Sequence, residues 1–326
     1  MTPRLQAAYD DDATEIVVPH RDYGHKGAFS LSVRRSSRVT ISNVLFHLLP
    51  QLGIQPAENE GPVTFSNVDL LMKDPSTELF FSWRGAYSVT GHNRWGFLIE
   101  DGDWNGSAMY DDTLAFYTRT QPITEINGET LTLQLSLEVR ASLFRPGDWL
   151  SIWSEAQDVL RGMSRIVAVG EENADRTVDV TLESLPIGTS LNDLAINEDT
   201  FNRDTLVRNC TTSNVGARHA STRLRTGGHF LNCHFDNMFV FTEFDPAFKP
   251  VRGRNLVLEN CYIRAPRDIR PAIGLLRSIN PRIINCTLDG TEVFGDLGAE
   301  SIYLEGNSWV NMTGNIVDLQ QGSEAW

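Results

Sequence analysis

Five carboxylates lie between residues 100 and 112, and two of them, Asp111 and Asp112, are consecutive; the others are Glu100, Asp101 and Asp103. Two carboxyl groups about 6.5 to 9.5 Å apart can hydrolyse a glycosidic bond with inversion, because one protonates the leaving oxygen while the other activates water. An adjacent acid also raises a neighbour's pKa by like-charge repulsion, which helps to keep one carboxyl protonated. Asp111 and Asp112 are therefore candidate catalytic residues, although a consecutive pair is also typical of a solvated turn.

Other polar side chains could hold a sugar beside this pair. Arg218, His219 and Arg223 lie in one stretch, and guanidinium groups suit sugar hydroxyls or a carboxylate or sulfate substituent. His219 could act as an acid or base. The alternative is a surface patch that balances charge. Glu243 and Asp245 follow on an otherwise aromatic strand, where burial would perturb the pKa of an acid.

Two tryptophans complete the candidate binding residues, together with Asp103. Trp83 and Trp104 lie beside polar and glycine turn residues. This placement favours exposed rings, which could stack on the apolar face of a sugar. The alternative is that they stack with other aromatic rings in the core.

The four cysteines reveal the elements that must position these residues. Each follows an asparagine, and the intervals from Cys210 to Cys233, Cys261 and Cys286 are 23, 28 and 25 residues. This spacing indicates a structural repeat, since a zinc site uses tight pairs such as Cys-x-x-Cys. We expect unpaired thiols stacked in the core, with a disulfide or a metal site as the alternatives.

The repeat continues without cysteine, at Val39–Val44 and Val63–Val68 upstream and at Tyr303–Asn307 downstream. Each unit is a short alternating strand that ends in Asn, Gly or Asp. Strand-rich units of this length predict an all-β chain, a right-handed parallel β-helix with rungs roughly 4.8 Å apart. The repeated asparagines are expected to form a ladder that gives buried amides hydrogen-bond partners.

The repeat fails between about residues 120 and 199. This segment holds four alternating strands, at 129–135, 145–153, 164–169 and 177–182, with Asn-Gly and Pro-Gly turns. They predict an inserted antiparallel β-barrel-like domain or small β-sandwich. The expected domains are therefore N-terminal coils at 1–119, the insertion at 120–199 and C-terminal coils at 200–326.

Charge and hydropathy limit the partners. The formal charge is −14, from 42 acids against 28 bases, so nucleic acid is not expected, whereas a neutral oligosaccharide or polysaccharide is compatible. No apolar stretch approaches the roughly 18 residues of a membrane span. Secretion or periplasmic export is favoured if a signal peptide has been removed, and a cytoplasmic location otherwise. No cofactor or metal is required, and a homo-oligomer is an open alternative because the C-terminal end lacks a convincing cap.

Several segments resemble glycoside hydrolase family 110, the exo-acting α-1,3-galactosidases. The similar segments are Leu98–Asp101 with Tyr110–Leu114, Phe144–Asp148, Asn214–His219 and Lys249–Leu256. The resemblance extends roughly from Val39 to Asn285, and the insertion begins where the family inserts a barrel into its β-helix. It implies that Asp111 and Asp112 are catalytic carboxylates.

The sequence departs from the family where another catalytic aspartate is expected, because Ser82–Val89 contains no acid. Asp101, Asp103 or Glu243 could take that role, or the reaction differs. We expect a glycoside hydrolase that acts on terminal galactosides by inversion. A polysaccharide lyase and a non-catalytic glycan-binding or adhesin-like β-helix are the alternatives, since the fold hosts all three functions.

Overall fold

The computed structural model describes residues 29–47, 52–74, 86–89, 92–105, 113–116, 119–136, 139–154, 156, 159–213, 221–224, 228–236, 239–242, 254–264, 273–276, 279–289, 292–296, 299–305, 311–313 and 316–321. Within these residues the chain is almost entirely β-structure, with two short 3-10 helices, η1 (Ala141–Leu143) and η2 (Glu198–Thr200). None of the described helices is long and apolar enough to cross a membrane.

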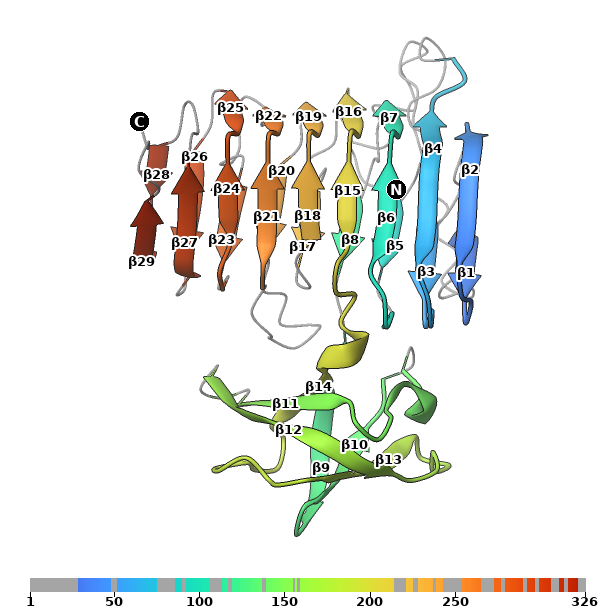
Figure 1. Ribbon diagram of the computed structural model, residues 1–326, viewed down its shortest axis with the longest axis vertical. Coiled ribbons are helices and arrows are strands. Elements are labelled where there is room, and N and C mark those ends of the chain that lie inside the picture. The colour runs from blue at the N-terminus through green and yellow to red at the C-terminus, as the bar shows by residue number, and fades with distance from the viewer. Residues whose placement is uncertain are drawn as a thin grey trace, which may run out of the picture.

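The predicted parallel β-helix is confirmed, and its strands form two sheets whose strands pair rung to rung (Figure 1). The nine-stranded sheet contains, in spatial order, β1 (Phe29–Arg34), β3 (Leu52–Ala57), β5 (Tyr87–Val89), β8 (Leu114–Phe116), β17 (Ser221–Leu224), β20 (Phe239–Thr242), β23 (Ile273–Leu276), β26 (Glu292–Asp296) and β28 (Asn311–Thr313). The fourteen-stranded sheet contains β2 (Val39–Phe46), β4 (Val63–Leu71), β6 (Phe97–Glu100), β7 (Asp103–Asn105), β15 (Leu206–Arg208), β16 (Thr211–Ser213), β18 (Gly228–Leu231), β19 (His234–Asp236), β21 (Leu256–Glu259), β22 (Tyr262–Arg264), β24 (Arg282–Ile284), β25 (Thr287–Asp289), β27 (Ala299–Glu305) and β29 (Ile316–Gln321).

Alternation along the strands places one column of apolar side chains in the core. Ile99, Val207, Phe230 and Leu258 occupy equivalent positions on consecutive rungs and are buried. The two sheets meet through aromatic contacts such as Phe97 with Phe116, whose ring centroids are 5.0 Å apart. Burying a side chain of this size contributes about 1.5 to 3 kcal/mol, so this column stabilises the stacking of the rungs in addition to their backbone pairing.

The cysteine prediction is confirmed. All four cysteines are buried and unpaired, and each lies between a bend in the fourteen-stranded sheet and the short strand that follows it. The side-chain hydrogen bond with Cys210, together with burial, raises the pKa of the Cys233 thiol to about 12. The Cys233 thiol therefore stays protonated at neutral pH and acts as a small apolar side chain.

The asparagine ladder exists, but the prediction that its amides are buried was wrong. The ladder residues are exposed and have φ between 50° and 56°; they are Asn43, Asn67, Asp101, Asn209, Asn232, Asn260 and Asn285. Asn67 Nδ2 donates to Asn43 Oδ1 at 2.9 Å, and Asn209 Nδ2 donates to Asp101 Oδ1 at 2.9 Å. Asparagine and aspartate recur here because they tolerate the left-handed conformation that the bend requires.

A second asparagine ladder, which the sequence analysis did not anticipate, is buried. Asn59, Asn93 and Asn202 are each 1% exposed. Asn59 Nδ2 donates to Asn93 Oδ1 at 2.9 Å, and Asn93 Nδ2 donates to Asn202 Oδ1 at 2.7 Å. Since an unpaired buried amide would be costly, this chain fixes the order of three rungs at the edge of the solenoid next to the insertion.

The insertion is a closed antiparallel barrel with the strand order β10-β13-β12-β11-β14-β9, and it lies below the solenoid in Figure 1. The strands are β9 (Gln121–Asn127), β10 (Thr130–Gln134), β11 (Trp149–Ser154), β12 (Val159–Val169), β13 (Thr177–Leu182) and β14 (Leu194–Asn197). The prediction of four strands missed β9 and β14. β9 contains a proline at its second position, and β14 is short and buried throughout, so neither shows a clear alternation.

Arg94 joins the barrel to the solenoid. It comes just before β6, and its Nη1 and Nη2 atoms donate to the two Asp148 carboxylate oxygens at 2.8 Å each. Asn197 Nδ2 also donates to Asp148, at 2.8 Å. Burial pushes the pKa of Asp148 upward, but hydrogen bonds from Arg94 and Asn197 outweigh it and hold this pKa below its usual value. The junction is therefore an ionised, nearly buried ion pair with specific geometry.

Candidate functional site

Most of the predicted site residues lie outside the described part of the chain. These are Asp111, Asp112, Arg218, His219, Glu243, Asp245 and Trp83. Arg223 lies on β17, where its backbone pairs with Ala115 of β8 and Phe241 of β20. The strands that flank the undescribed segments still show where those segments begin and end.

The segments that carry the two main groups of candidates connect equivalent strands. Asp111 and Asp112 belong to the connection from β7 to β8, and Arg218 and His219 belong to the connection from β16 to β17. β7 pairs with β16, and β8 pairs with β17, in parallel. The two connections therefore start and end on consecutive rungs, roughly 4.8 Å apart.

The structure corrects the prediction for Trp104 and shows the surroundings of Asp103. Trp104 was expected to be exposed, but it is fully buried, and its ring lies 5.5 Å from that of Tyr87. It cannot stack on a sugar. Alternation along β7 directs it inward, while Asp103 before it is half-buried and accepts a hydrogen bond from Thr211 Oγ1 at 2.8 Å. Asp103 thus joins neighbouring rungs.

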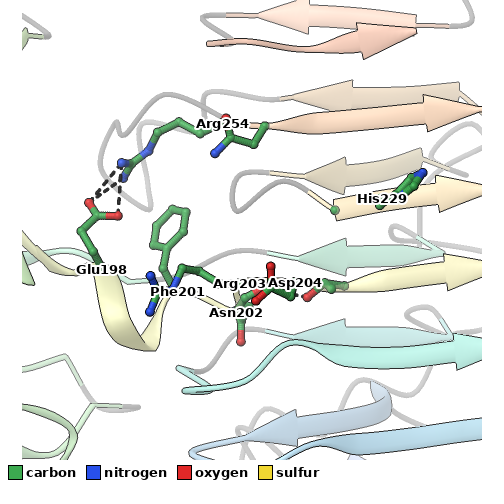
Figure 2. A pocket seen from close by; sticks show the side chains of 10 residues that line it. Glu198, Phe201, Asn202, Arg203, Asp204, His229 and Arg254 are labelled. Carbon is green, nitrogen blue, oxygen red and sulfur yellow. Dashed lines mark hydrogen bonds and ion pairs between the residues drawn. The ribbon is translucent and has the colours of Figure 1, made fainter. Parts of the chain in front are cut away.

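The described residues contain a hollow of about 290 Å³ where the barrel meets the solenoid (Figure 2). Its lining comes from η2 and the segment after it, and from the starts of β18 and β21; the lining residues are Glu198, Phe201, Asn202, Arg203, Asp204, Thr205, Gly228, His229, Arg254 and Asn255. The hollow therefore crosses three consecutive rungs at the barrel edge of the solenoid.

One wall of the hollow is an ion pair between barrel and solenoid. Arg254 donates to Glu198 through Nη1 and Nη2, both at 3.1 Å from Oε1. The guanidinium also lies over the rings of Phe201 and Trp153, at 4.7 and 5.0 Å from their centroids. Ser151 Oγ donates to the same carboxylate. Because Glu198 is occupied by these donors, it is a structural residue of the wall rather than a free acid.

The opposite wall carries groups with unused hydrogen-bonding capacity. His229 Nε2 contacts Glu259 Oε2 at 2.9 Å, and Arg203 donates to Asp199 at 2.6 Å. Asp204 is exposed, and its carboxylate makes no hydrogen bond or ion pair with any described residue. Both Asp204 and Asn255 have left-handed backbones, with φ of 61° and 56°. The hollow thus combines one unpaired acceptor with several paired charges.

Sequence reasoning did not find the hollow. Glu198 and Arg254 are 56 residues apart and belong to no motif. A signal for this edge of the solenoid was the second asparagine spacing, in which Asn59, Asn93 and Asn202 each lie four residues before a strand of the fourteen-stranded sheet. The barrel insertion separates the last two, so the period is hidden.

Comparisons with known proteins give little beyond the fold. No protein-family model matches the chain, and no curated protein matches it. One similar solved structure is the Gp54 tailspike of Acinetobacter baumannii bacteriophage AP22 in complex with A. baumannii capsular saccharide. It is 12% identical, with a TM-score of 0.21, and the match covers 83% of this chain and 61% of that tailspike. A likeness this low carries no argument about function.

Proposed function

We propose that this protein is a carbohydrate-active glycoside hydrolase that acts on terminal galactosides by inversion, as the resemblance to glycoside hydrolase family 110 implies. The observation that carries the proposal is the anchoring of two connections on consecutive rungs. One holds Asp111 and Asp112, and the other holds Arg218 and His219. The next connection, from β19 to β20, has only two residues, Asn237 and Met238.

In the proposed reaction, one carboxyl of the aspartate pair protonates the glycosidic oxygen as the bond to the anomeric carbon breaks. The second carboxylate removes a proton from water, and that water oxygen forms the new bond on the opposite face of the sugar. The two products are the free sugar with inverted configuration and the shortened acceptor. Arg218 and His219 would orient the sugar through its hydroxyl groups.

Chain connectivity separates Glu243 and Asp245 from this pair. Asp112 precedes the start of β8, whereas Glu243 follows the end of β20, and both strands run parallel within one sheet. The segments that carry these acids therefore leave the sheet at opposite ends of their strands. Glu125 is an exposed acid on β9 of the barrel and belongs to no candidate site, so Glu125→Gln is a matched control for Asp112→Asn.

The test is incubation with terminal α- and β-galactosides, followed by chromatography of the released sugar and by NMR of its first-formed anomer. Release with inversion is expected, with turnover lost in Asp112→Asn and kept in Glu125→Gln, at an unchanged melting temperature. Full activity in Asp112→Asn would remove the pair from the mechanism. An unsaturated product that absorbs in the ultraviolet would indicate a lyase, and binding without product would indicate a glycan-binding solenoid.

A further inference from the structure

The hollow at the junction is separate from the proposed catalytic connections. It lies at the start of β15, whereas the connection that carries Arg218 and His219 begins after β16. Eight residues, from Leu206 to Ser213, separate these two points. At about 3.3 Å per residue, with one bend, the distance is roughly 20 Å. The hollow is therefore separate from the point where that connection begins.

The charges around the hollow disfavour an anionic ligand. The ion pairs Arg254–Glu198 and Arg203–Asp199 each cancel locally. The carboxylate of Asp204 and the chain's formal charge of −14 would repel an anion. A ligand rich in hydroxyl groups avoids this repulsion, because it can donate to Asp204 and accept from Asn255.

An exposed indole belongs to the rung next to those that form the hollow. Leu98 pairs with Leu206 on the next rung. Trp95 and Arg203 each lie three residues before these leucines, so they occupy equivalent positions on neighbouring rungs. Trp95 is 57% exposed, the highest value among the described tryptophans. The adjacent Gly96 permits this close approach, since a Cβ there would lie 2.1 Å from the Arg203 carbonyl oxygen. A flat, exposed ring next to polar groups suits the C–H face of a pyranose.

The walls of the hollow are fixed before any ligand binds. Asn202 belongs to the buried amide ladder, and Arg254 is held by Glu198 and two aromatic rings. Thr205 Oγ1 donates to the Asn202 carbonyl oxygen at 2.8 Å, which closes the turn that presents Asp204. These side chains therefore lose little conformational entropy when a ligand binds, and this favours affinity in a small polar site.

We propose that the junction hollow is a saccharide-binding site for a neutral pyranoside, with Trp95 as the stacking platform and Asp204 as the main hydrogen-bond acceptor. The site would hold a second part of a glycan, away from the bond that is cleaved. It does not depend on catalysis, so it stands if hydrolysis fails.

The experiment uses the full chain carrying Asp112→Asn, so that no substrate is consumed. Neutral oligosaccharides of galactose, glucose, mannose and N-acetylglucosamine, one to four units long, are titrated by calorimetry, beside galacturonic acid oligomers of equal length. At least one neutral member should bind, and the galacturonic acid series should not. Trp95→Ala and Asp204→Asn should each weaken that binding about tenfold, since a charge-assisted hydrogen bond or a stacking contact contributes on that order. Asp204→Asn keeps a residue that tolerates the left-handed backbone.

Ile187→Ala is the matched control, because Ile187 is an exposed residue on the barrel and belongs to neither site. It should leave the dissociation constant unchanged. The proposal is overturned if no neutral saccharide binds, or if binding is equally tight in Trp95→Ala and Asp204→Asn. Hydrolysis of the same saccharides is also measured with the chain in which Asp112 is intact, and this separates the two proposals. Binding without any hydrolysis contradicts only the catalytic proposal. Hydrolysis without binding at the hollow contradicts only the proposal of a saccharide-binding site.

Discussion

His92 lies where the chain passes between solenoid and barrel, and it should make stability depend on pH. Its ring is 1% exposed, and Nδ1 contacts Thr200 Oγ1 at 3.0 Å. Nε2 has no hydrogen-bond partner among the described residues. Burial lowers the pKa of His92 to about 4, against an opposing hydrogen-bond contribution from the Arg119 backbone, while repulsion from the Arg119 charge adds a smaller decrease. The folded chain therefore keeps this imidazole neutral at a pH where the unfolded chain protonates it.

The sign and size of the effect follow from linkage. Between pH 6.5 and 4 the unfolded state binds one more proton at His92 than the folded state, so the free energy of unfolding falls as the pH falls. One pKa unit corresponds to about 1.4 kcal/mol, so the full loss is about 3 kcal/mol once the pH is below 4. Between pH 7 and pH 5 the loss is about 2 kcal/mol. Above pH 6.5 the titration of His92 hardly changes the free energy of unfolding.

Urea unfolding of the full chain at pH 7, 6 and 5, followed by tryptophan fluorescence, measures this slope. Carboxylates titrate in the same range, so the informative quantity is the difference between the wild-type chain and His92→Gln. The variant should lose about 2 kcal/mol less than the wild-type chain between pH 7 and pH 5. His234→Gln, which changes an exposed histidine, should retain the wild-type slope. An equal slope in His92→Gln and wild type would refute the reasoning.

Three further predictions concern the elements that position the sites. Arg94→Met should lower the free energy of unfolding by about 3 kcal/mol or more, because it leaves Asp148 nearly buried without its ion-pair partner; an Asp148→Leu change in the same chain should recover part of this loss in a double-mutant cycle. Asn209→Ala should cost about 1 kcal/mol in chemical denaturation, whereas Asn209→Gly should cost less, since only alanine is strained at φ 54°. The four thiols should stay unmodified by Ellman's reagent in the native chain and react completely in denaturant; fast labelling of the native chain would contradict the buried stack.

The sequence was sufficient to predict the solenoid because the repeated feature has one local cause. Each Asn-Cys pair marks a left-handed bend followed by a buried position, and both requirements are visible in the residue types. The same register would have placed Trp104 correctly. Trp104 is two residues after Gly102, as Phe235 is two residues after Cys233, and the strands that carry them align through Thr212. Trp104 was expected from the sequence to be exposed, although the register places this position in the core.

The hollow could not be predicted because its parts come from separate segments. Glu198 follows the barrel, and Arg254 lies two rungs later, after a connection whose length has no fixed period. Only the paired register of β15, β18 and β21 brings these residues together. Asp204 and Trp95 are ordinary surface residues in the sequence, and their relation depends on the close contact at Gly96.

Ion pairs on different rungs hold the barrel against the solenoid, and one of them joins Arg145 of the barrel to Glu60 before β4. Arg94 precedes β6 and binds Asp148, while Arg254 precedes β21 and binds Glu198, so these two anchors are three rungs apart. At roughly 4.8 Å per rung this separation is about 14 Å, which is long enough to oppose rocking of the barrel along the solenoid axis. The solenoid itself does not need the insertion, since β6 and β15 pair directly as consecutive rungs. Because both anchors border the segment from Glu198 to Thr205, the barrel fixes the wall of the hollow in advance, and a ligand there would gain affinity from contacts that need no rearrangement.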